Sequence, residues 1–167
     1  DVAASRGLGD VYKRQVLDMK KIAVIILNWN GADLLRKFLP SVCAHTNAHI
    51  ADVIVVDNGS DDNSVEVLKQ EFPQVKTLLF PQNCGFAAGY NKALEMLDYK
   101  YAVLLNSDVE TTPHWLEPLL EFTEDNPDVA ACQPKIKSLR RREKFEYAGA
   151  AGGFIDRYGY PFCRGRI

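Results

Sequence analysis

Apolar residues along the chain follow two patterns, short continuous runs and stretches with helical spacing. The continuous runs, rich in Ile and Val, predict buried β-strands at residues 21–28, 51–58, 75–80, 101–108 and 128–136. Between them, apolar residues recur every three or four positions, which predicts helices at residues 32–45, 60–72, 86–99 and from Thr112 onwards. This alternation is typical of an α/β fold, an open and mainly parallel sheet with helices on both faces.

The ends of the expected helices carry local signals. Ser60 and the aspartates after it can cap the helix over residues 60–72. Thr112 and Pro113 match a helix start, with threonine as the cap and proline at the first helical position. Pro40 falls inside the first expected helix, which it can kink or end.

The composition is that of an ordinary globular protein. Of the 167 residues, 47% are hydrophobic and 25% are charged, which is enough apolar material for one core. The net charge of −2 argues against a nucleic-acid-binding protein. The longest apolar run, residues 22–27, is too short to span a bilayer.

The four cysteines are widely spaced and form no C-x-x-C pair. This spacing argues against a disulfide framework or a zinc site, so we expect reduced thiols in a cytosolic protein. The cysteines are Cys43, Cys84, Cys132 and Cys163.

Three regions follow from the pattern. Residues 1–18 have no periodicity and no apolar segment of a signal peptide, so we expect a non-native or disordered leader. Residues 19–137, which begin at Met19, hold the strand–helix repeat. Residues 138–167 are basic and then rich in Gly and aromatic residues, without a clear helix.

Polar and glycine residues follow each of the first four expected strands. Ligands of open α/β sheets bind beyond the carboxyl ends of the strands, so these loops mark the expected site. Ordinary turn and cap chemistry can explain each loop alone, but four such loops on one edge favour a binding site. The loops are residues 28–31, 57–62, 83–86 and 106–108.

The loops lack the glycine cradles of other nucleotide-binding folds. Neither G-x-G-x-x-G after the first strand nor G-x-x-x-x-G-K-[ST] occurs, which argues against dinucleotide-binding and P-loop proteins. A divalent cation on a carboxylate can neutralise a diphosphate instead, because Mg²⁺ and Mn²⁺ accept one or two protein oxygens together with phosphate and water. Asp108, directly after an apolar strand, is placed for that role.

Four motifs occur in a characteristic order and spacing: NWNG, VDNGSDD, NCGFAAGYNKAL and LLNSDVE. Together they resemble the nucleotide-binding half of inverting family 2 glycosyltransferases with the GT-A (Rossmann-like) fold, over residues 21 to about 136. The later EYAGAAGGFIDRYGYPFCRGR looks like members that modify bacterial surface polysaccharides, including rhamnosyltransferase-like ones. The resemblance therefore implies an enzyme of polysaccharide biosynthesis in the bacterial cell envelope. It implies that residues 19–137 are the nucleotide-sugar-binding part and that residues 138–167 are the truncated start of an acceptor-side region.

The resemblance implies that the first two loops bind the nucleoside. Asn28 and Asn30 would line the base and ribose pocket. Asp57 would accept a hydrogen bond from a pyrimidine, with Asn58 and Asp61 nearby.

The other two loops are implied to bind the diphosphate and the sugar. Gly85 and Asn91 belong to the segment beneath these groups. Asn106, Ser107 and Asp108 take the place of the D-x-D motif, whose last acid binds Mg²⁺ or Mn²⁺. Asn106 stands where many members have Asp, which implies a lower metal affinity.

The implied reaction is a single displacement with inversion at the anomeric carbon of a UDP- or dTDP-linked sugar, typically a hexose. The acceptor is a hydroxyl of a glycan or a lipid-linked glycan, and a carboxylate base removes its proton. In the family this base belongs to an acidic pair after a second glycine-aromatic motif. GGFID ends in Asp156, but no acid follows it, so we expect the chain to lack the base and to be inactive as a fragment.

Two other functional classes stay open. A sugar-nucleotide pyrophosphorylase would share the layout, but it would need a Gly-rich basic loop where this chain has NWNGADLL. A non-catalytic nucleotide-binding module would need Asp57 but not Asp108. The expected location is the cytoplasm, with peripheral association at the inner face of the plasma membrane left open.

Overall fold

The computed structural model describes residues 21–146 and 153–163. They fall into two compact units, of which the first ends at Pro113 and the second begins at His114. The expected leader, residues 1–18, lies outside the described residues. The boundary at residue 137 between donor-side and acceptor-side regions stays a prediction.

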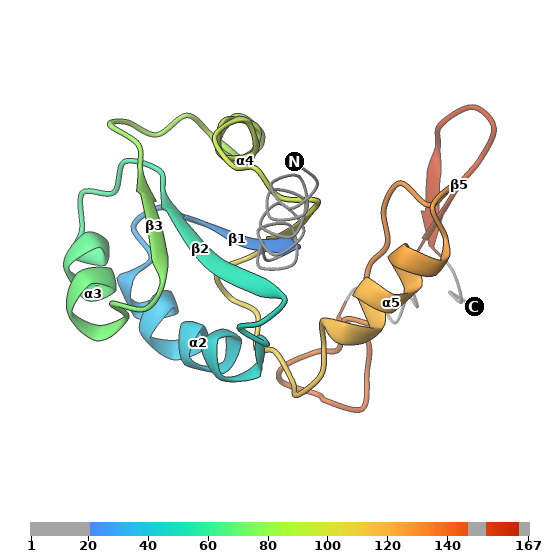
Figure 1. Cartoon of the computed structure of the whole chain (residues 1–167), viewed down its shortest axis with the longest axis horizontal. Helices are drawn as coiled ribbons and strands as arrows, with labels where there is room; N and C mark the ends of the chain where they lie inside the picture. The colour runs from blue at the N-terminus through green and yellow to red at the C-terminus, as the bar shows by residue number, and fades with distance from the viewer. Residues whose placement is uncertain (1–20, 147–152, 164–167) are drawn as a thin grey trace, which may run out of the picture. The chain divides into compact units, whose positions relative to one another are not determined.

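A four-stranded parallel sheet forms the centre of the first unit (Figure 1). Its order is β3-β2-β1-β4, and each strand pairs in parallel with its neighbour. The sheet confirms the first four predicted strands and the predicted fold class. The strands are β1 (Ile22–Asn28), β2 (Ala51–Asp57), β3 (Lys76–Leu79) and β4 (Tyr101–Leu105).

Helices lie on both faces of this sheet, as expected (Figure 1). α2 (Ala32–His45) and α3 (Ser64–Glu71) contact each other on one side, and α4 (Phe86–Glu95) lies on the other. β1 and β2 are covered from both sides and bury almost all of their residues, which explains their continuous apolar sequence.

The face beneath α4 is a compact apolar cluster. Tyr90 and Ala93 of α4 pack with Ile25 of β1 and Val56 of β2. Because side chains alternate along a strand, the buried residues between them point to the opposite face. The two central strands therefore have two buried sides.

Pro40 does not end α2, which continues to His45. α3 begins at Ser64 rather than at Ser60, because residues 60–63 form the turn after β2. The helix expected from Thr112 is α5 (Glu117–Asp125), so that prediction is wrong at its start.

The reason for the late start of α5 is local. His114 has φ 58, a left-handed conformation that an α-helix cannot contain. Pro118 then occupies the first turn of the helix, where its missing N–H leaves no bond unmade. Thr112 therefore does not cap α5.

The prediction of a fifth strand over residues 128–136 is also wrong. These residues form neither helix nor strand and are almost all exposed. A strand is stable only when a neighbour satisfies its backbone groups, and residues 128–136 pair with no strand in the described part of the chain. The apolar residues of this segment were therefore a misleading signal.

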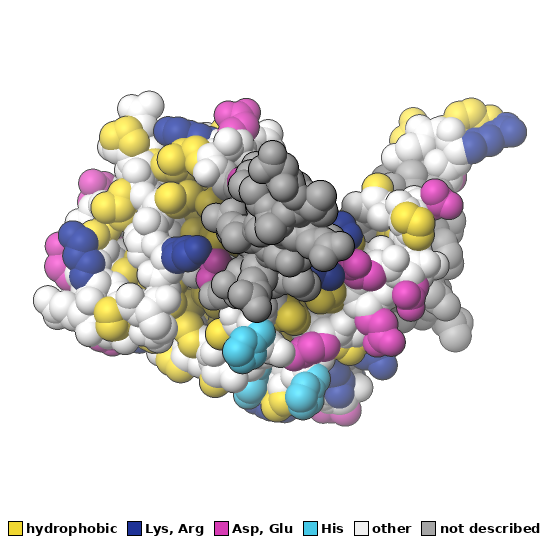
Figure 2. Space-filling model, in the orientation of Figure 1, with side chains coloured by type: hydrophobic (Ala, Val, Ile, Leu, Met, Phe, Trp, Pro, Cys, Tyr) yellow, Lys and Arg dark blue, Asp and Glu magenta, His cyan; other side chains and the backbone are white. Residues whose placement is uncertain are grey.

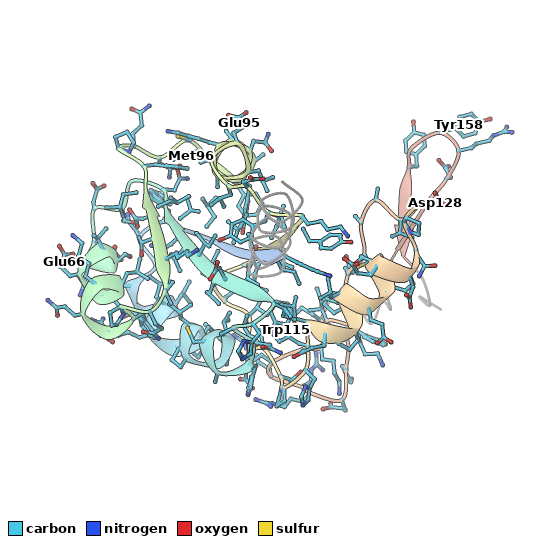
Figure 3. All side chains as sticks on the ribbon, in the orientation of Figure 1. Glu66, Glu95, Met96, Trp115, Asp128 and Tyr158 are labelled. Carbon is cyan, nitrogen blue, oxygen red and sulfur yellow. The ribbon has the colours of Figure 1, made fainter. Side chains whose placement is uncertain are left out.

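The second unit contains α5 and a short antiparallel hairpin, β5 (Gly153–Ile155) and β6 (Pro161–Cys163). At the hairpin turn, one oxygen of Asp156 accepts the backbone N–H groups of Tyr158 and Tyr160, at 2.8 and 3.0 Å. Tyr158 lies at this tip (Figure 3), where hydrophobic and basic side chains are exposed (Figure 2). Asp156 thus builds a turn, which accounts for an acid at this position without a catalytic role.

Within the described ranges, no helix has both the length and the apolar character needed to cross a bilayer.

Candidate functional site

The carboxyl ends of the four parallel strands place the candidate site. The chain proceeds from β1 outwards to β2 and β3, and then returns to the other side of β1 to form β4. The connections therefore reverse direction between β1 and β4, and ligands of open α/β sheets bind at such a reversal. Asn28 ends β1 there, and Asn106 and Asp108 follow the end of β4.

A buried amide–carboxylate pair joins the ends of β1 and β2. The Asn28 amide donates to the Asp57 carboxylate at 3.1 Å. Both residues are buried, with Asn28 1% exposed and Asp57 3% exposed. The other Asp57 oxygen accepts the backbone N–H of Ser60 at 3.0 Å. Two donors thus compensate the burial of this charge, as a carboxylate inside a protein requires.

The turns after β1 and β2 also hold each other. The Ser60 hydroxyl accepts the backbone N–H of Asn30 at 2.9 Å, and the Asn30 side-chain oxygen accepts that of Asp61 at 2.8 Å. Asn30 has φ 50, a conformation that asparagine tolerates better than most residues. The two turns therefore form one braced unit, and the Asp61 side chain stays exposed at its rim.

Asp62 joins the starts of α2 and α3. Its two oxygens accept the backbone N–H groups of Ala32 and Ser64, at 3.1 and 2.9 Å. Partial burial pushes the pKa of the Asp62 carboxyl upwards, but hydrogen bonds from Ser64 and Ala32 outweigh it and lower this pKa below its ordinary value. The charged form of Asp62 thus stabilises both helix N-termini.

Asn58 connects the turn after β2 to the start of α4. Its amide donates to the Asn83 side chain at 3.0 Å and to the Gly85 carbonyl at 3.2 Å, while its oxygen accepts the Cys84 N–H at 2.9 Å. Asn58 is 2% exposed, and its three side-chain hydrogen bonds all go to the third loop. Its task in this structure is to fix the entry of α4.

Two glycines allow this close packing. Gly59 has φ 71, and a Cβ there would lie 2.6 Å from the backbone of Gln82. A Cβ at Gly89 would lie 3.0 Å from the Leu27 side chain and 3.4 Å from the Asn58 amide nitrogen. α4 therefore approaches β1 as closely as it does because position 89 has no side chain.

The turn after β4 carries Asn106 and Asp108, both exposed. Among the described residues, no hydrogen bond or ion pair to the Asp108 carboxylate is present. Its charge is therefore available to a ligand.

This turn is held at both of its ends by helices. Before it, the Tyr90 hydroxyl of α4 donates to the Leu105 carbonyl at 3.0 Å, and burial raises the pKa of Tyr90, so the hydroxyl remains a donor. After it, Thr111 contacts α2 twice. Its N–H donates to the Ser41 hydroxyl at 3.2 Å, and its carbonyl lies 2.7 Å from His45 Nδ1. Asp108 thus stands on a short segment that is fixed on both sides.

The structure brings most of the expected site residues to one edge. Asn28, Asn30, Asp57 and Asn58 form a connected network with Gly85. Asp61 joins it through its backbone, and Asn106 and Asp108 lie on the turn after β4, the neighbour of β1. Asn91 is exposed on α4, and none of the hydrogen bonds among the described residues ties it to the network.

Four residues that organise the site were not assigned to it from the sequence. Ser60, Asp62 and Asn83 lie in the expected loops, and Asp62 followed by Ser64 ahead of a helical pattern is a recognisable turn signal. Tyr90 gives no such signal, because an aromatic residue on the apolar stripe of a helix reads as core.

The side chains at this edge determine which metal ions the site could bind. Within residues 21–146 and 153–163, no three His, Cys, Asp or Glu side chains converge as a metal cage. A single exposed carboxylate, Asp108, with the Asn106 amide two residues before it, can still supply oxygen ligands. Mg²⁺ is commonly held by one or two carboxylates plus substrate phosphates, so the residues fit an ion that arrives with a diphosphate.

The chain is similar to curated proteins over most of its length. The glycosyltransferase YibD of Escherichia coli K12, described as uncharacterized, is 34% identical over 116 residues, 67% of this chain and 33% of YibD. The N-acetylglucosaminyl-diphospho-decaprenol L-rhamnosyltransferase of Mycobacterium tuberculosis is 24% identical over 127 residues, 70% of this chain and 41% of that protein. The chain therefore spans less than half the length of either relative.

Solved structures share the fold. Staphylococcus aureus TarS 1-349 in complex with UDP-GlcNAc has a TM-score of 0.58 and 18% identity, over 72% of this chain and 39% of that one. This likeness agrees with the predicted GT-A fold. Residues 23–161 also match the sequence model of the family described as "Glycosyl transferase family 2". A match over so much of the chain shows that this protein belongs to glycosyl transferase family 2.

Proposed function

We propose that the chain is the donor-binding part of an inverting glycosyltransferase. It would bind a UDP- or dTDP-linked sugar, whose sugar is transferred to a hydroxyl of a glycan or lipid-linked glycan. Membership of glycosyl transferase family 2 supports this proposal. The observation that carries it is the arrangement at the carboxyl edge, where a buried polar network stands beside an exposed acid on a turn held at both ends.

The braced turns after β1 and β2 are our proposed nucleoside site. A carboxylate offers about four lone-pair positions, and Asp57 uses two of them within the chain, so it retains the capacity to accept from a pyrimidine N–H. Asn28 fixes the orientation of this carboxylate. Asn30 would line the pocket around the base and ribose, and Asn58 and Asp61 would lie nearby.

The diphosphate and sugar would lie towards α4 and the turn after β4. Gly85 precedes the N-terminus of α4, where backbone N–H groups favour a negative charge. Asn91, exposed on the same helix, would face the sugar side. Asn106 and Asp108 would approach the diphosphate from the end of β4.

Asp108 is our proposed metal ligand, with Asn106 as an orienting neighbour and Mg²⁺ or Mn²⁺ as the ion. When bound, such an ion stabilises negative charge on the leaving diphosphate. The residues of the chain bind and orient the donor, and the braced turns keep the base fixed while the sugar is exposed to the acceptor. We assign the role of general base to none of these residues.

The proposal is tested by titrating the purified chain with UDP and dTDP, with and without Mn²⁺, in a calorimeter. We expect Mn²⁺ to strengthen nucleotide binding by about tenfold or more, equal to about 1.4 kcal/mol. Asp108→Asn keeps the shape of the side chain but removes its charge, so Mn²⁺ should give this variant no advantage. Asp98→Asn, which removes another exposed acid just before β4, is the matched control and should behave as the parent.

The outcomes separate the alternatives. If the parent chain binds nucleotide with the same affinity with and without Mn²⁺, a non-catalytic nucleotide-binding module is indicated. An unchanged Mn²⁺ effect in Asp108→Asn would make Asp108 an ordinary turn residue. No nucleotide binding at all by a folded chain would refute the proposed site.

A further inference from the structure

A basic loop in the second unit is not used by the proposed reaction. Residues 135–144 (KIKSLRRREK) contain six Lys or Arg residues and one Glu, a net charge of +5. The whole chain has a net charge of −2, so the remaining residues together carry −7. The positive charge is thus concentrated in one segment of an otherwise acidic protein.

The loop has a defined backbone. Lys137 and Phe145 form an antiparallel bridge, and the Ser138 N–H donates to the Lys144 carbonyl at 2.9 Å. The Lys144 N–H donates in turn to the Arg141 carbonyl at 2.8 Å. These bonds make residues 137–145 a closed loop that contains three consecutive exposed arginines.

Several basic side chains of this loop make no ion pair within the described part of the chain. All six basic residues are exposed. Among the residues that the structure describes, no ion pair involves Arg140, Arg141 or Lys144. The loop can therefore bring several positive charges to an external anionic surface.

Two exposed apolar side chains lie within the same segment. Ile136 is 50% exposed and Leu139 is 40% exposed. Basic residues interspersed with apolar ones suit the membrane interface, where charges meet anionic headgroups and apolar groups enter the acyl boundary. A nucleic acid is the weaker fit, because the protein is acidic overall and Phe145, the aromatic residue beside the segment, is half-buried.

We propose that the loop of residues 135–144 binds the surface of membranes that contain anionic phospholipids. Such binding would hold the protein beside membrane-embedded molecules. It rests on the charge and exposure of the loop, and it does not depend on the proposed nucleotide site.

The test is co-sedimentation of the purified chain with vesicles of phosphatidylcholine, alone or mixed with phosphatidylglycerol. We expect binding to the mixed vesicles only, and its loss in roughly 0.5 M salt, where screening shortens electrostatic reach to a few ångströms. The triple substitution R140Q/R141Q/R142Q should weaken binding by about tenfold or more, because each basic residue near the surface contributes to the attraction. R140K/R141K/R142K keeps the charge and should keep the binding.

The matched control is K37Q/K69Q/K100Q, which removes the same charge from exposed lysines of the first unit. It should bind as the parent chain does, and circular dichroism should show that every variant is folded. Equal losses in the control and in R140Q/R141Q/R142Q would overturn the proposal in favour of a diffuse charge effect. Equal binding to both vesicle types, tighter binding to duplex DNA, or displacement from vesicles by uridine diphosphate would each overturn it as well.

Discussion

Replacing Asn28 by aspartate tests the physical basis of the candidate site most directly. The Asn28 amide lies 3.1 Å from the Asp57 carboxylate, and both residues are almost fully buried. Asn28→Asp preserves the shape of the side chain but replaces a hydrogen-bond donor by a second carboxylate. We expect a stability loss that depends strongly on pH.

The size of the loss follows from the distance. Two unit charges about 3 Å apart repel by roughly 5 kcal/mol at an effective dielectric constant of about 20. The protein can avoid this repulsion by keeping a proton on one carboxyl. At pH 7 that proton costs about 4 kcal/mol for a group whose unperturbed pKa is about 3.9. The smaller penalty applies, so the variant should be about 4 kcal/mol less stable than the parent at pH 7.

The pH dependence has a definite sign. The introduced carboxyl would have a folded-state pKa raised above its unfolded value, because burial and a neighbouring charge disfavour ionisation. Its protonated form can donate to Asp57 as the amide does, so stability is retained below the unfolded pKa. That stability is lost as the pH rises towards the folded pKa. Near pH 4 the difference between variant and parent should therefore fall to about 1 kcal/mol or less.

The assay is urea unfolding followed by circular dichroism at several pH values between 4 and 8. Asn63→Asp is the control, because Asn63 is exposed and makes no side-chain cap bond; we expect it to change stability by about 0.5 kcal/mol or less. A difference between Asn28→Asp and the parent that does not vary with pH would refute the reasoning. So would a loss at pH 7 no larger than that of the control.

Two further predictions concern the same edge. Asp57→Ala should weaken UDP binding in the absence of metal, by about 0.5–1.5 kcal/mol, or by up to roughly 3 kcal/mol if the contact is charged. Calorimetry on the folded variant measures this loss, and an unchanged affinity would limit Asp57 to a role in the turn. Tyr90→Phe removes the hydrogen bond from the Tyr90 hydroxyl to the Leu105 carbonyl, so urea unfolding should show a loss of about 0.5–1.5 kcal/mol. It should also reduce the Mn²⁺ effect on UDP binding. A loss of stability with an unchanged Mn²⁺ effect would limit Tyr90 to a packing role.

The two central strands of the sheet, β1 and β2, could be predicted from the sequence because they are buried on both faces. Residues such as Ile25 and Val55 belong to continuous apolar runs that only a covered strand accommodates. The same signal failed over residues 128–136, since an apolar run does not reveal whether a neighbouring strand is available. The predicted start of α5 was wrong because no cap pattern in the sequence reveals the left-handed conformation of His114.

The location of the candidate site could be predicted from the sequence, but its hydrogen-bond network could not. Parallel strands end at a common edge, so polar residues such as Asn28 and Asp57 had to meet there. Which side chains bond to which depends on the register and on close approaches, such as the position of Gly59 against Gln82. Tyr90 was not predictable at all, because its role depends on a hydroxyl that reaches the end of β4 across the core.

The bracing of the site also bears on how the protein folds. The bonds from Asn28 to Asp57 and from Asn58 to Asn83 join residues 29 and 25 positions apart. They can form only after the parallel strands have paired, which is slow because long loops must close first. Interactions that are absent from the folding transition state slow unfolding and leave the folding rate almost unchanged. A nucleotide bound to this network would therefore prolong the life of the folded chain without helping it to form.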